Sequence, residues 1–191
     1  MRVIAGSLRG RSLYRVPSSK TRPTSDKVKE AVFHKLGPYF DGGEGLDLFA
    51  GSGALGIEAL SRGMEHVTFI ERHPEAIATI RKNIKHLQLE NRASIYRNDA
   101  SRALDILHKR KKKFHLILLD PPYNSKVYAS FVARIRSLNL LHPGGYLYLE
   151  HAPKEEIAYD TEYYTEMFRR DYSKEIAVTI LQVHEDEIGE E

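Results

Sequence analysis

The sequence predicts an α/β fold, and three observations lead to it. Apolar runs alternate with helical patterns between residues 46 and 150. A glycine-rich turn joins the first of these runs to a helical pattern. Two later apolar stretches have no helix-length segment between them. The alternation favours a parallel sheet with helices on both faces, and the later stretches favour an antiparallel pair. We therefore expect a mostly parallel, seven-stranded sheet with an antiparallel C-terminal strand pair.

Each element follows from local pattern and punctuation. The strands are expected at residues 46–50, 66–71, 93–97, 114–120, 145–150, 161–169 and 174–183. The helices between them are expected at residues 54–62, 74–87, 101–108 and 127–138. An earlier helix is expected to begin after a cap at Thr24 or Ser25. It should end at about Leu36, because Gly37-Pro38 cannot continue it.

The N-terminal segment differs from the rest in its charge. Residues 1–25 contain six basic side chains and no acid. Because arginine binds phosphates in a bidentate manner and stacks on bases, this segment favours contact with a nucleic acid. We expect a basic arm or hairpin at residues 1–24 and the main domain at residues 25–191. A second basic run, residues 109–113, fits a solvated surface equally well.

Composition excludes several classes of protein. The chain of 191 residues suffices for one α/β domain with a sizeable core. It contains no cysteine, which excludes disulfides and thiolate metal sites, and its histidines form no convincing metal-ligand cluster. It has neither an apolar run of membrane-spanning length nor a signal-peptide pattern. We therefore expect a cytoplasmic protein that needs no metal and no membrane, and that acts as a monomer.

A glycine-rich loop follows the first strand. Gly51, Gly53 and Gly56 match the pattern G-x-G-x-x-G between a strand and a helix. Glycine allows positive φ and lets a ligand approach the backbone closely. The pattern suits a dinucleotide, whose pyrophosphate would lie at the helix N-terminus. A tight strand–helix turn without any ligand is the alternative.

Three acids near this loop favour a different ligand. Asp47 precedes Gly51 by four residues and would repel a pyrophosphate, but it could hold a cationic amino-acid group. Glu71 ends the next strand, where an acid binds ribose hydroxyls. S-adenosylmethionine (SAM) carries ribose, a sulfonium and an ammonium but no phosphate, so these acids suit it better than NAD. Asp99 could accept a hydrogen bond from the adenine amino group, or could equally be a helix N-cap.

The most specific signal is Asp120-Pro121-Pro122-Tyr123, which follows a buried-strand run. The two prolines fix the backbone and should hold the acid and the aromatic ring at the edge of the sheet. An exocyclic amine on a base is a poor nucleophile, because its lone pair is delocalised into the ring. Asp120 and the Pro121 carbonyl could accept its two N–H bonds and stabilise the charge that develops during methyl transfer. Tyr123 could stack on a flipped base.

These motifs together resemble a known family. Residues 47–63, then Glu71, Asn98-Asp99 and Asp120–Tyr123, resemble the RsmD-type 16S rRNA guanine-N2 methyltransferases. Residues 2–13 and 22–33 resemble that family's leading segments, so the likeness covers about residues 1–150. The last 40 residues agree only in general pattern.

The resemblance implies a Rossmann-like SAM-dependent methyltransferase fold that acts on 16S ribosomal RNA or a small-subunit assembly particle. SAM would lie along Gly51, Ser52 and Gly53. Arg22, Thr24 and Asp26 would lie near its methionine end. The N-terminal β-hairpin would contact RNA, and we assign that contact to Arg9, Arg11 and Arg22.

Three alternatives stay open at this point. An adenine-N6 DNA or RNA methyltransferase could use the same Asp-Pro-Pro-Tyr site, although such DNA enzymes usually carry a separate target-recognition region. An NAD-dependent oxidoreductase would use the glycine loop but leave Asp120–Tyr123 and the basic arm unexplained. A non-catalytic RNA-binding module would not need an intact Asp120.

Overall fold

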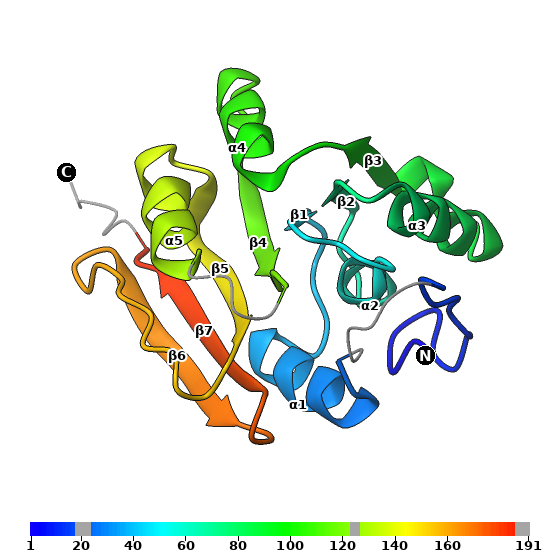
Figure 1. Ribbon diagram of the computed structural model, residues 1–191, viewed down its shortest axis with the longest axis horizontal. Helices are drawn as coiled ribbons and strands as arrows, with labels where there is room; N and C mark the ends of the chain where they lie inside the picture. Colours follow the sequence, from blue (N-terminus) through cyan, green and yellow to red (C-terminus); the bar gives the residue numbers. More distant parts are fainter. Residues whose placement is uncertain (18–23, 123–126, 186–191) are drawn as a thin grey trace.

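A seven-stranded sheet with the order β3-β2-β1-β4-β5-β7-β6 forms the centre of the molecule (Figure 1). The computed structural model describes residues 1–17, 24–122 and 127–185. The strands are β1 (Glu44–Asp47), β2 (His66–Glu71), β3 (Ala93–Arg97), β4 (Phe114–Leu119), β5 (Leu141–His151), β6 (Tyr164–Asp171) and β7 (Ala177–Val183). Strands β1 to β5 are parallel, and β7 is antiparallel to both β5 and β6. The predicted fold class is confirmed.

Helices cover both faces of this sheet. They are α1 (Asp26–Leu36), α2 (Ala54–Ser61), α3 (Pro74–His86), the short 3-10 helix η1 (Glu90–Arg92), α4 (Ala100–Lys109) and α5 (Tyr128–Ser137). Leu116 and Leu118 of β4 join the core beneath α1, α2 and α3, whereas Ile117 and Leu119 join the core beneath α4 and α5. Burial on both faces explains why β4 is apolar almost throughout. None of the described helices is long and apolar enough to cross a membrane.

Four of the expected strand boundaries were wrong by three or four residues. Strand β1 ends at Asp47 rather than at residue 50, because Phe49 has a φ of 123° and turns the backbone out of the extended conformation. Strands β6 and β7 each begin three residues later than expected. Strand β5 begins at Leu141 rather than at residue 145. Leu141 pairs with Phe114 of β4, so β5 also includes Pro143-Gly144. We expected this segment to lie outside the strand, because Pro-Gly is typical of a turn.

Thr24 and Ser25, the two residues expected to cap α1, have different hydrogen-bond partners. The Ser25 hydroxyl accepts a hydrogen bond from the Val28 amide at 3.3 Å, so Ser25 is the N-cap. Thr24 instead donates its hydroxyl to the Glu150 carboxylate at 2.7 Å. The residue just before α1 is therefore tied to the end of β5.

Residues 1–17, the N-terminal hairpin, lie against α2 and α3 (Figure 1). One antiparallel bridge, Arg2 with Ser12, joins its two halves, and no regular strand forms in these residues. Val3 and Leu13 are buried in the core. The hairpin is therefore docked, and the boundary expected at residue 24 falls next to residues outside the described part. The division into arm and domain stays a prediction.

Candidate active site

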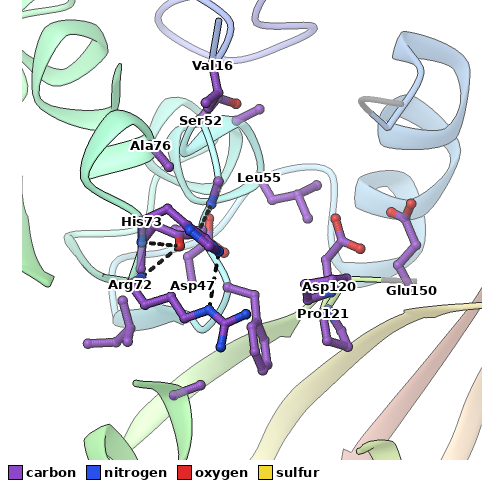
Figure 2. Close-up of a pocket in the computed structure, with 18 of the residues that line it drawn as sticks. Val16, Asp47, Ser52, Leu55, Arg72, His73, Ala76, Asp120, Pro121 and Glu150 are labelled. Atoms are coloured by element: carbon purple, nitrogen blue, oxygen red, sulfur yellow. Dashed lines mark hydrogen bonds between the residues drawn. The ribbon is translucent and has the colours of Figure 1, made fainter. Parts of the chain in front are cut away.

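A cavity of about 1400 Å³ opens at the carboxyl ends of the parallel strands. It lies where the strand order reverses between β1 and β4, which is where doubly wound sheets bind ligands. Its wall combines the ends of β1, β2, β4 and β5 with Met1, Arg15 and Val16 of the N-terminal hairpin (Figure 2). The cavity is large enough for a nucleoside-sized ligand together with part of a second one.

The glycine loop forms one wall of this cavity. Gly51 and Gly53 have φ values of 55° and 82°, which side chains rarely adopt. A Cβ atom on Gly51 would meet nothing within 4 Å, so the backbone there is open to a ligand. Gly53 is the N-cap of α2 and does not line the cavity, whereas Ser52 does. Gly51 and Ser52 thus line the cavity and Gly53 lies behind them, while binding of SAM by this loop stays a prediction.

Glu71 binds this loop to the end of β2. One carboxylate oxygen accepts the Gly51 amide at 3.0 Å, and the other accepts the amides of Arg72 and His73 at 2.7 and 2.9 Å. Three backbone donors therefore fix the side chain at the cavity wall. Its expected role in binding ribose stays a prediction, and its observed role is to hold the loop.

Asp47 supports the loop from inside the sheet. It is buried, and its Oδ2 accepts the Gly56 amide at 3.0 Å. A Cβ atom on Gly56 would lie 2.4 Å from the Phe69 ring, so only glycine lets α2 pack this closely. Burial raises the pKa of Asp47 to about 7, the Gly56 amide opposes this rise, and the Glu71 charge adds to it.

Asp47→Asn is expected to flatten the pH dependence of stability while keeping the bond to Gly56. The unfolded chain releases the Asp47 proton near pH 3.8, and the folded protein keeps it up to about pH 7. The wild-type protein therefore loses stability as the pH rises through this window, by on the order of 4 kcal/mol. Denaturant unfolding at pH 4 and pH 8 should show that the variant gains most at pH 8. An equal effect at both pH values would contradict the assignment.

Asp120 follows β4 directly and faces the cavity (Figure 2). Within the described residues, its carboxyl accepts no hydrogen bond. Burial raises its pKa well above the ordinary value, and the charges of Glu150 and Asp47 raise it further. Pro121 is buried and Pro122 exposed, and both line the cavity. Tyr123 lies outside the described residues. The carboxyl thus remains available to a ligand's donors.

Glu150 is a site residue that our sequence analysis did not identify. It lines the cavity, is 4% exposed, and lies beside Asp120 (Figure 2). Its Oε2 accepts the hydroxyls of Thr24 and Tyr148, both at 2.7 Å. Burial raises its pKa, and these two hydrogen bonds oppose the rise. The sequence offered one signal for Glu150, because this acid stands at the end of a predicted strand.

The remaining expected residues divide into three groups. Asp99 lines the cavity, but its Oδ1 caps α4 by accepting the amides of Ser101 and Arg102. Thr24 also lines the cavity, whereas Asp26 forms an exposed ion pair with Arg2 at 2.9 Å. The exposed side chains of Arg9 and Arg11 lie outside the cavity, and Arg22 lies outside the described residues.

Three carboxyls at the cavity, those of Asp47, Asp120 and Glu150, have raised pKa values, chiefly because they are buried. None of the described lysines, arginines or histidines contributes to the pKa of Asp47, Asp120 or Glu150. Such a site favours a cationic ligand, which would lower all three pKa values on binding. It disfavours a pyrophosphate, whose charge would add to the repulsion.

Comparisons with known proteins show which family the chain resembles. The family described as conserved hypothetical protein 95 matches residues 1–181. The YlbH protein of Bacillus subtilis is 52% identical over 157 residues, which cover 82% of this chain and 85% of YlbH. Ribosomal RNA small subunit methyltransferase D of Haemophilus influenzae is 38% identical over 152 residues, 78% of each chain.

A solved structure shares the fold at lower identity. It is the T. thermophilus 16S rRNA N2 methyltransferase RsmC, in complex with AdoMet and guanosine. The TM-score is 0.64 at 22% identity, over 88% of this chain and 44% of that one. This likeness shows the fold alone. The family match over residues 1–181 and the relative from Haemophilus influenzae show more: the chain belongs to the conserved hypothetical protein 95 family, that of the ribosomal RNA small subunit methyltransferase D proteins.

Proposed function

We propose that this protein transfers a methyl group from SAM to an exocyclic amine of a base in 16S ribosomal RNA. The observation that carries the proposal is the Asp120 carboxyl, which faces the same cavity as the glycine loop and accepts no hydrogen bond from the described residues. Methyltransferase activity on ribosomal RNA is supported by the family. Transfer to the N2 amine of guanine is the finer part of the proposal.

The charge of the site supports SAM as the methyl donor. The three carboxyls, whose raised pKa values no described lysine, arginine or histidine lowers, suit a ligand that carries a sulfonium and an ammonium group. In this proposal the ribose and methionine parts lie along Gly51 and Ser52, near Glu71 and Thr24, and Asp99 keeps one oxygen for the adenine amine. The same charges disfavour NAD, so the oxidoreductase alternative is not favoured.

The acceptor chemistry follows from Asp120. Its carboxyl and the Pro121 carbonyl accept the two N–H bonds of the target amine, which orients the nitrogen lone pair toward the methyl group. Accepting these bonds also stabilises the positive charge that develops on nitrogen. Alignment of the two reactants supplies a further large part of the rate. Adenine-N6 transfer would use the same groups, so the choice of guanine rests on the resemblance to the family.

We assign RNA binding to the N-terminal hairpin and expect its arginines to dominate the salt dependence. Arg9 and Arg11 are exposed, and Arg15 lines the cavity wall. Replacing Arg9 and Arg11 with glutamine should weaken binding of 16S rRNA and reduce the slope of log K against log [salt] by about 1.4, or about 0.7 for each lost single-strand phosphate contact. Filter binding at several salt concentrations measures this slope. The exposed residues Lys154 and Lys174, which lie outside both basic segments, are changed to glutamine as the control. An unchanged slope in the hairpin variant would remove RNA binding from these arginines.

Two measurements test the function itself. Isothermal calorimetry should show binding of SAM and none of NAD. Mass mapping of 16S rRNA from cells with and without the gene should show one methylated guanine that is lost with the gene. We expect the substrate to be this RNA or a small-subunit assembly particle, and the protein to act in the cytoplasm as a monomer. NAD binding, or an unchanged modification map, would contradict the proposal.

A further inference from the structure

The strand register places a second carboxyl beside Asp120. Leu119 at the end of β4 pairs with Leu149 of β5. The next residues along the two parallel strands are Asp120 and Glu150, so their side chains leave the sheet on the same face. Neighbouring strands lie about 4.8 Å apart. Figure 2 shows the two carboxyls side by side and directed the same way.

Glu150 has side-chain hydrogen-bond donors that Asp120 lacks among the described residues, although burial raises the pKa of both carboxyls. Its Oε2 accepts the hydroxyls of Thr24 and Tyr148, which favour the ionised form. Asp120 receives no such support from the described residues. The two carboxyls thus differ, since two hydrogen bonds favour the anion of Glu150 against the effect of burial, whereas no described donor favours the anion of Asp120.

We propose that Glu150 is a positioning residue of the methyl-transfer site, whose negative charge sets how strongly Asp120 holds a proton. This inference rests on the proposed function. In the reaction, the amine nitrogen forms the N–C bond with its lone pair, the C–S bond breaks, and that electron pair stays on sulfur. The nitrogen becomes positively charged, and one of its protons passes to the ionised Asp120 and from there to water. A negative neighbour makes Asp120 a stronger base for this step.

Few other groups face the pair. Asp47 of β1 raises the pKa of Asp120 through its charge. The Tyr148 hydroxyl faces Glu150, and burial keeps its own pKa well above the ordinary value, so it remains neutral. Thr24 does not titrate. None of the described lysines, arginines or histidines shifts either carboxyl, so Glu150 is the main charge that acts on Asp120.

Single-turnover methylation of 16S rRNA, measured from pH 5.5 to 9, tests the inference. The wild-type rate should fall at low pH as Asp120 takes up a proton. Glu150→Gln keeps the shape and the acceptor oxygen but removes the charge, so this acid limb should move to lower pH by about one unit. The rate at high pH should fall as well, because Asp120 becomes a weaker base. Glu156→Gln, an exposed change six residues along the chain, should leave the limb in place.

A second variant keeps the test valid if Glu150→Gln does not fold. Thr24→Val removes one hydroxyl donor to Glu150, so Glu150 is protonated more easily, and the limb should move in the same direction by less. Loss of rate by the same factor at every pH, or an unmoved limb, would mean that Glu150 is only structural. A wild-type protein without methyl transfer would overturn the function and this inference together. An active wild type with unmoved limbs in both variants would overturn the inference alone.

Discussion

Asp120→Ala is expected to slow methyl transfer by roughly a hundred- to thousandfold while SAM still binds. The reason is that Asp120 lies at the end of β4 beside the glycine loop but makes no hydrogen bond to it. Its removal would take away the proposed acceptor of the target amine and leave the bonds that shape the loop, from Glu71 and Asp47, in place. Single-turnover rates with 16S rRNA measure the first effect, and calorimetry with SAM measures the second.

Two further variants sharpen this prediction. Asp120→Asn keeps an acceptor oxygen but cannot take up the proton, so it should lose less rate than alanine and should show no acid limb. Asp41→Ala removes an exposed carboxyl that lines no part of the cavity and should behave as wild type. Near-normal turnover in Asp120→Ala would remove Asp120 from the mechanism.

Glu58→Ala is expected to cost about 3–5 kcal/mol of unfolding free energy. Glu58 of α2 is fully buried and accepts the Ile4 and Ala5 amides at 3.0 and 3.1 Å. It also pairs with Arg62 at 3.0 Å and lies 3.9 Å from the Lys29 ammonium. Burial lowers the pKa of Lys29, and the Glu58 charge opposes this fall. Alanine would leave two buried cations without their counter-charge and two hairpin amides without their acceptor.

A surface ion pair supplies the matched control for Glu58. Lys112 and Glu44 lie 3.0 Å apart, with side chains 45% and 37% exposed. Glu44→Ala should cost less than about 1 kcal/mol, because solvent screens such pairs. Denaturant unfolding measures both variants, and limited proteolysis should cut residues 1–17 faster in Glu58→Ala alone. Equal costs for the two variants would contradict the buried network as the anchor of the hairpin.

The loop and the acid that follows β4 could be predicted because their signals are local. The apolar run of β4 reports burial on both faces, and the prolines after Asp120 end it. The positive φ of Gly51 marks the turn, and in α2 a Cβ atom on Gly56 would meet the Phe69 ring. The expected cap at Ser25 was also correct for a local reason, since a hydroxyl there reaches an amide three residues later.

Other features depended on tertiary neighbours that local sequence patterns do not reveal. Asp99 was left between a helix cap and a ligand contact, and the structure shows the cap. We predicted that residues 1–24 form an arm, because their charges suit nucleic acid. In the structure, Glu58 and Asn83 are buried on helices distant in sequence and accept hydrogen bonds from the backbone of residues 1–17. Thr24 was one of two predicted cap residues, but its hydroxyl instead donates a hydrogen bond to Glu150, 126 residues away in sequence.

By itself, the sequence determined the fold class, the glycine loop and the acid after β4, because periodicity, glycine and proline act within a few residues. Only the tertiary structure decided that β5 lies beside β4 in a register that brings Glu150 next to Asp120. Strand order depends on packing across the whole sheet, and the charge of one carboxyl acts on another through space. That interaction cannot be read from two residues 30 positions apart.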